Sequence, residues 1–136
     1  EVYFVAGGEI KEGEEGELEL RAKDNERVIK GFDAGFNYDS TAIKILEISV
    51  NSSIFDENLG NTNDESLGKT TIWGESGKSG SELSKGEIVL AKIKIKAIKK
   101  GTTMLYRDRA AIMKVETGEG ISEVGFEMPD FKLNIL

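Results

Sequence analysis

The chain has 136 residues, of which 38% are hydrophobic, so we expect a single domain over residues 1–136 with one sizeable core. Its formal net charge of −7 argues against nucleic acid and anionic lipid as partners, because both select basic surfaces. Cysteine and histidine are both absent, which excludes disulfides, thiolate chemistry and the commonest general base and transition-metal ligand.

Apolar residues alternate with polar residues along most of the chain, and this period of two predicts β-strands. No segment shows the 3.6-residue stripe of an amphipathic helix. Eight or nine strands, separated by turns rich in Gly, Asn and Ser, indicate an all-β sandwich. In chain order, the predicted strands are Val2–Ala6, Glu17–Lys23, Ile29–Tyr38, Ile43–Val50, Thr70–Glu75, Glu87–Ile98, Met104–Val115 and Phe131–Leu136.

Two of the predicted strands depart from simple alternation or carry a lysine face, and one long polar segment separates two strands. The apolar residues of Ile43–Val50 change parity after Ile45, which predicts a bulge or a strand buried on both faces. In Glu87–Ile98, the apolar positions from Val89 to Ala97 form one face, and the lysines at 92, 94 and 96 form a solvated face that discourages edge pairing. For the polar residues 51–68 we predict a long loop with a short edge strand around residues 54–55.

The segment from residue 31 to residue 39 is the most informative. One face of this predicted strand is apolar and consists of Phe32, Ala34, Phe36 and Tyr38. The other face carries no long charged side chain and consists of Gly31, Asp33, Gly35 and Asn37. We interpret it as a flat hydrogen-bonding surface kept clear for a partner. The alternative is that Asp33 is a solvated residue on an ordinary strand.

Trp73, the only tryptophan, shares its parity with Thr71 and Glu75 and is opposite in parity to Ile72. If Ile72 points inward, Trp73 points outward beside polar residues, which is typical of an interface anchor. The alternatives are that Trp73 belongs to the core while Ile72 faces outward, or that its indole packs on the neighbouring strand.

Three patterns associated with other chemistry are weak. Residues 74–79 resemble the end of a phosphate-binding loop, but Ile72 stands where the first glycine is required and no helix follows, so we predict a turn. The Asp, Glu and Asn residues between 56 and 65 suit calcium but lack the spacing of a helix–loop–helix site, so we predict a solvated loop. No carboxylate pair is marked out for glycoside hydrolysis. We predict no catalytic residue, no bound metal and no cofactor.

Four segments resemble, in order, parts of a cohesin domain. They are Gly16–Leu20, Val28–Ile48, Ile72–Ala97 and Lys100–Thr103. The second contains Gly-x-Asp followed by Tyr-Asp at residues 38–39. The third contains an acidic Ser-Gly turn at residues 75–77 and the long alternating strand EIVLAKIKIKA. The resemblance spans nearly the whole chain, and the order and spacing of the segments carry it.

The resemblance implies a flattened nine-stranded β-sandwich with jelly-roll topology and no catalytic activity. Cohesins bind dockerins, small calcium-loaded helical modules, through one sheet face, and so attach enzymes or other proteins to a scaffold. It therefore implies a dockerin-type partner, a polysaccharide-related setting and an extracellular or cell-surface location. We expect a monomer or a weak homodimer, with no membrane insertion because no apolar run approaches 18 residues. The start at Glu1 favours a mature or excised domain.

Carried over by position, Asp33 matches the acidic residue that hydrogen-bonds the dockerin helix, and Gly77 matches a turn glycine. Gly31 stands where many type I members have Asn, and Thr71 stands at a position that is usually apolar. Gly74 stands where the family often has Glu, which here follows one place later. These departures from the family pattern imply a divergent, type I-like cohesin whose partner has a different specificity. They also allow a cohesin from outside the cellulose-degrading assemblies. The predicted partner-binding residues are Gly31, Asp33, Gly35, Asn37, Thr71, Trp73, Glu75 and Gly77.

Two other functions remain open for such a sandwich. A carbohydrate-binding module needs coplanar aromatic rings, for which one Trp and three Tyr are a poor supply. A structural spacer in a cell-surface protein would pack the flat face against a neighbouring domain.

Overall fold

The computed structural model describes all 136 residues and confirms the predicted all-β class, with eleven strands and one 3-10 turn. No helix in it could cross a lipid bilayer. The elements are β1 (Val2–Ala6), β2 (Glu15–Asp24), β3 (Val28–Asn37), β4 (Ile43–Val50), β5 (Glu57–Asp64), β6 (Lys69–Glu75), η1 (Gly80–Glu82), β7 (Gly86–Ala97), β8 (Gly101–Arg107), β9 (Ala111–Thr117), β10 (Gly120–Phe126) and β11 (Phe131–Ile135).

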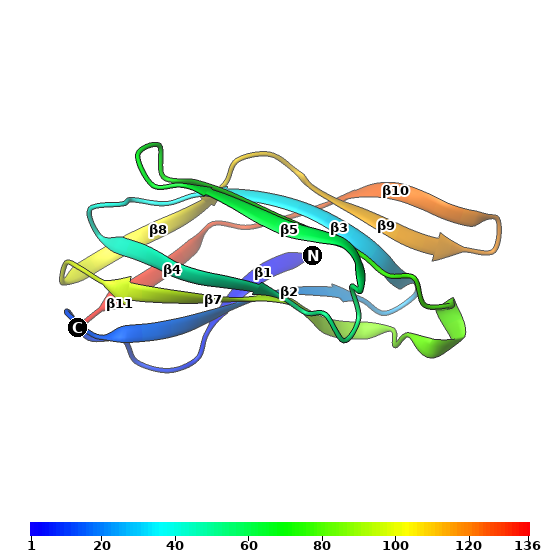
Figure 1. Ribbon diagram of the computed structural model, residues 1–136, viewed down its shortest axis with the longest axis horizontal. Coiled ribbons are helices and arrows are strands. Elements are labelled where there is room, and N and C mark those ends of the chain that lie inside the picture. Colours follow the sequence, from blue (N-terminus) through cyan, green and yellow to red (C-terminus); the bar gives the residue numbers. More distant parts are fainter.

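The strands form two antiparallel sheets. A four-stranded sheet has the order β1-β2-β7-β4, and a seven-stranded sheet has the order β10-β9-β3-β6-β5, with β8 joining β3 to β11. The strands run along the long axis of an elongated molecule, with the β9–β10 hairpin at one end and the C-terminus at the other (Figure 1). Because the seven-stranded sheet packs only its inner side on the core, its outer side is available for contacts with other molecules.

The core lies between the sheets and is one cluster of 28 buried residues. The predicted alternation accounts for it: Leu18, Leu20 and Ala22 of β2 are fully buried, whereas Glu19 and Arg21 between them lie on the solvent side and are half-buried. Aromatic rings from different elements meet edge to face within it, as Phe4 does with Phe36 at a centroid distance of 5.0 Å. Each strand therefore contributes one apolar face to a shared interior.

Two bulges explain the irregular patterns in the four-stranded sheet. The pairing of β4 with β7 shifts between Ile45 and Glu47, which confirms the bulge predicted from the change of parity. The pairing of β2 with β7 shifts where Leu90 is the extra residue. Leu90 and Ala91 are consequently both fully buried, and Val89, which we predicted to face inward, is only half-buried.

The prediction of a long loop over residues 51–68 is wrong, because this segment contains β5. That strand pairs with β6 along its length and forms one edge of the seven-stranded sheet. None of its residues is buried, so it carries no apolar alternation that would reveal a strand. The predicted edge strand around residues 54–55 is instead a turn, in which the Phe55 amide donates to the Asn51 carbonyl and the Phe55 side chain enters the core.

The prediction of one strand over Met104–Val115 is also wrong, because β8 and β9 are separate strands. β8 pairs with the end of β3, and β9 pairs with its beginning. Between them the chain turns, and the Asp108 amide donates to the Gly35 carbonyl at 2.9 Å. β10 was not predicted, since Phe126 is its only buried residue and the strand pairs with β9 alone.

The buried position of Phe55 gives a test of the turn that holds it. Phe55 is fully buried, with its ring 4.9 Å from that of Phe32, so Phe55→Ala leaves a cavity between the sheets. We expect it to lower the free energy of unfolding by about 3–5 kcal/mol in urea denaturation. Leu67→Ala is the control, because Leu67 is 67% exposed in the same segment and its loss should cost less than about 0.5 kcal/mol. Equal effects of the two changes would contradict the placement of Phe55.

Candidate functional site

The outer face, meaning the solvent side of the seven-stranded sheet, gathers most of the residues predicted to bind a partner. Phe32 and Ile72 point into the core, so their neighbours Asp33 and Trp73 point outward. The pairing of β3 with β6 sets Asp33 opposite Trp73 and Gly31 opposite Glu75. The same register sets Gly35 opposite Thr71 and Asn37 opposite Lys69. Trp73 thus faces outward, as one of our interpretations held.

Asp33 lies near the centre of the outer face and has an ion-pair partner within the chain. Its side chain is 48% exposed, and its Oδ1 accepts a hydrogen bond from the guanidinium of Arg109. Arg109 belongs to the turn between β8 and β9, which the sequence placed inside a single strand. The carboxylate is therefore accessible but already engaged through one of its two oxygens.

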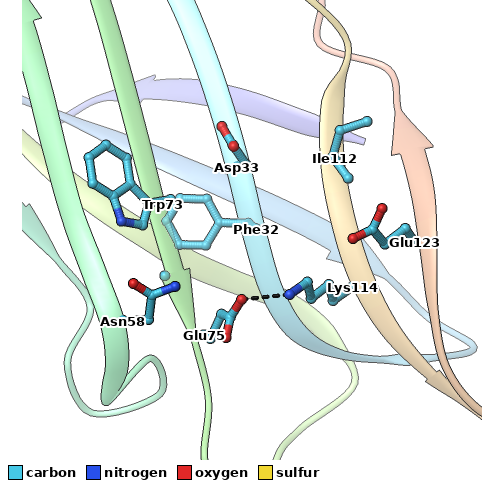
Figure 2. Close-up of a pocket in the computed structure, with 9 residues that line it drawn as sticks. Phe32, Asp33, Asn58, Trp73, Glu75, Ile112, Lys114 and Glu123 are labelled. Atoms are coloured by element: carbon cyan, nitrogen blue, oxygen red, sulfur yellow. Dashed lines mark hydrogen bonds and ion pairs between the residues drawn. The ribbon is translucent and has the colours of Figure 1, made fainter.

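Glu75 is paired in the same way. The Lys114 ammonium, from β9, donates to Glu75 Oε1 at 2.5 Å across β3, directly over Gly31 (Figure 2). Gly31 has no side chain to stand between them, and a Cβ there would lie only 3.2 Å from the Gly74 carbonyl oxygen. The hydrogen bond to Glu75 raises the pKa of Lys114, although partial burial opposes it.

The outer face is therefore not the clear, flat plate that the small residues suggested. Side chains from neighbouring strands lie over the glycines, because a glycine leaves room that a longer side chain can occupy. The indole of Trp73 packs on Gly60 of β5, where a Cβ would lie 2.8 Å from the ring. Trp73 thus points outward and also packs on the strand next door, which combines two of the alternatives. Asp108 lies in ordinary contact beside Gly35.

A depression of about 360 Å³ lies in this face. Trp73 and Ile112 stand on either side of it, since both are in register with Asp33 on the strands that flank β3. Figure 2 shows Asp33 between them and the Glu75–Lys114 pair below. The residues that line the depression are Phe32, Asp33, Asn58, Trp73, Gly74, Glu75, Ile112, Lys114 and Glu123.

Gly77 lies apart from the other predicted residues. It follows the end of β6, where its amide donates to Asp56 Oδ1 at 2.8 Å, and a Cβ on it would lie 2.4 Å from Glu57 Oε1. The hydrogen bond from Gly77 is the main cause that lowers the pKa of Asp56. Gly77 therefore shapes the loop at the end of the sheet, and the only helical residues that follow are the three of η1.

No group of three or more acidic residues in the structure is placed to hold a metal ion. Of the acidic and amide side chains for which we predicted a loop over residues 56–65, those from Glu57 to Asp64 lie along β5, and Asp56 and Glu65 flank it. Asp64 caps the turn after that strand, where its carboxylate accepts hydrogen bonds from Ser66 and from the Leu67 amide.

No family profile and no curated protein matches this chain. Solved structures match over nearly its whole length. The seventh type I cohesin of ScaB from Pseudobacteroides cellulosolvens has a TM-score of 0.77 at 20% identity, covering 99% of this chain and 92% of that one. The sixth cohesin of scaffoldin B from Acetivibrio cellulolyticus, in complex with a dockerin, has a TM-score of 0.77 at 15% identity, covering 99% and 97%.

A type I cohesin–dockerin complex from Clostridium thermocellum has a TM-score of 0.75 at 17% identity, covering 98% of this chain and 92% of that one. The chain has the cohesin fold. The fold expected from the four sequence segments is thereby confirmed, with two more strands than the nine that the resemblance implied.

The residues on β9 and β10 that line the depression were not predicted from the sequence as binding residues. Ile112 and Lys114 alternate with the buried residues Ala111, Met113 and Val115, and this alternation was visible in the sequence. It did not show that β9 would lie beside β3. Glu123 could not be placed at all, because Phe126, at the end of β10, is the only buried residue of that strand.

The Glu75–Lys114 pair predicts a pH dependence. Because the pKa of Lys114 is higher in the folded chain than its ordinary value, the pair stabilises the fold from neutral pH up to about pH 10 and loses that effect as the pH rises through the raised pKa. Glu75→Gln should lower the pKa of Lys114, as followed through its Cε signal by NMR. Glu17→Gln, on the other sheet, should leave it unchanged. An unchanged pKa in Glu75→Gln would contradict the pairing.

Proposed function

We propose that this chain is a non-catalytic protein–protein interaction module that binds a dockerin-type partner through the outer face of its seven-stranded sheet. The cohesin fold supports this proposal, since two of the solved structures that share it are complexes of a cohesin with a dockerin. The observation that carries it is the outward row formed by Trp73, Asp33 and Ile112 on three adjacent strands.

This row has the chemistry of a binding surface. Trp73 and Ile112 offer apolar area on either side of an acceptor, an arrangement in which a few central anchors dominate the affinity. The second carboxylate oxygen of Asp33 accepts no hydrogen bond within the chain and is free for a donor from the partner. An interface centred here would bury roughly 1,200–2,000 Å² in total. The proposed binding residues remain those predicted from the sequence, with Gly77 contributing through the loop.

The proposed setting follows from the proposed function. A dockerin-binding module attaches its partner to a scaffold outside the cell or on its surface, and we propose that this one acts there as a monomer. A carbohydrate-binding module would need a platform of several rings, whereas Trp73 is a single indole seated on Gly60. A pull-down on insoluble polysaccharides separates that alternative, and a spacer would bind neither polysaccharide nor dockerin.

The double variant Asp33→Ala with Glu75→Ala tests the binding face. We expect it to weaken binding to a dockerin module by roughly 30-fold or more, or about 2 kcal/mol, as measured by isothermal titration calorimetry across a panel of dockerins. Both carboxylates are partly exposed, so their loss should change the free energy of unfolding by less than about 1 kcal/mol.

The matched control is Glu17→Ala with Glu47→Ala. These exposed residues lie opposite Lys94 on the four-stranded sheet, and their removal changes the net charge equally. The control should bind like the wild type. Full binding by the Asp33/Glu75 variant, or equal loss in both variants, would remove the assignment of the face.

A further inference from the structure

The depression on the outer face carries more negative than positive charge. Its lining includes three carboxylates, those of Asp33, Glu75 and Glu123, and a single ammonium, that of Lys114. Lys114 binds Glu75 and lies in register with Glu123, which has no ion pair of its own. Like charges in such positions repel unless a cation lies between them.

The walls of the depression suit the stem of a long side chain. Trp73 and Ile112 flank it, and β3 places Asp33 between them. Long basic side chains bury their methylene stems against apolar groups and keep the charged head at polar ones. A cation next to an indole also gains from the ring's negative face.

The chain's own basic groups already bind two of these carboxylates. The guanidinium of Arg109 lies on Asp33, and the ammonium of Lys114 lies on Glu75. We propose that the depression receives one long basic side chain of the partner, an arginine or a lysine. Its stem would lie between Trp73 and Ile112 and its head among Asp33, Glu75 and Glu123. This inference rests on the proposed function and adds the chemistry of the partner.

Arginine fits the depression better than lysine does. A planar guanidinium can stack on an indole and bind a carboxylate through two parallel hydrogen bonds, which an ammonium cannot do. The proposal also gives Arg109 a role in specificity. Because Arg109 holds one oxygen of Asp33, it competes with the incoming side chain and sets how strongly basic partners are favoured.

The test uses the indole signal of Trp73, which is unique because the chain has one tryptophan. The 15N-labelled protein is titrated by NMR with N-acetyl-arginine amide, N-acetyl-lysine amide and uncharged N-acetyl-norleucine amide at matched ionic strength. We expect a saturable millimolar shift of the Trp73 indole and the Ile112 amide with arginine, a weaker one with lysine and none with norleucine. Equal responses to arginine and norleucine would overturn the proposal.

Charge variants distinguish specific binding of arginine in the depression from a general disturbance of the outer face. Glu75→Gln with Glu123→Gln should weaken arginine binding by about tenfold, and Arg109→Gln should strengthen it, because Asp33 is released. Glu17→Gln with Glu47→Gln on the other sheet should have no effect. A loss of binding in Arg109→Gln, or no loss in Glu75→Gln with Glu123→Gln, would refute the assignment.

The titration contains no dockerin, so its outcome is independent of the proposed function. A dockerin that binds the outer face of the wild type and of the Glu75/Glu123 variant equally well would overturn the proposal that a basic side chain binds in the depression. It would leave the proposed function intact. Saturable arginine binding without binding of any dockerin would support the depression as a site for a basic side chain and would count against the proposed function.

Discussion

The central position of β3 is the constraint on which the rest of this structure depends. One of its faces supplies Phe32, Ala34 and Phe36 to the core, and the other supplies the middle of the outer face. It pairs with β6 along one edge and with both β9 and β8 along the other. A slip of one residue in its register would expose the core face and bury Asp33. The packing of the interior therefore fixes the geometry of the candidate site.

Glycines on the outer face decide how its charges meet. Gly31 lies between Glu75 and Lys114 in register, and the absence of its side chain lets that ion pair close over β3. Gly60 likewise gives the indole of Trp73 a seat on β5. Small residues thus let side chains of neighbouring strands lie across them, the Glu75–Lys114 pair over the central strand and the indole of Trp73 toward the edge strand β5. The face is consequently a set of paired charges around a depression rather than a bare surface.

The likeness to cohesins at 15–20% identity has a physical explanation. A sandwich needs apolar side chains at alternate positions and turns at suitable intervals, and many sequences meet both needs. The outer face is under no such packing constraint, because its side chains meet solvent or a partner. Sequence can diverge there while the fold stays the same. The fold is thus a sound basis for proposing the face.

The sequence by itself determined the all-β class, the buried faces of most core strands and the common parity of Trp73 and Glu75, because a period of two is a local property of the chain. It left open whether β4 has a bulge and whether Trp73 points outward. It could not reveal β5 or β10, whose residues are almost all exposed and leave no alternation. Only the tertiary structure decided that Arg109 meets Asp33 and that Lys114 meets Glu75. These pairs join segments 76 and 39 residues apart, and only strand order and register bring such segments together.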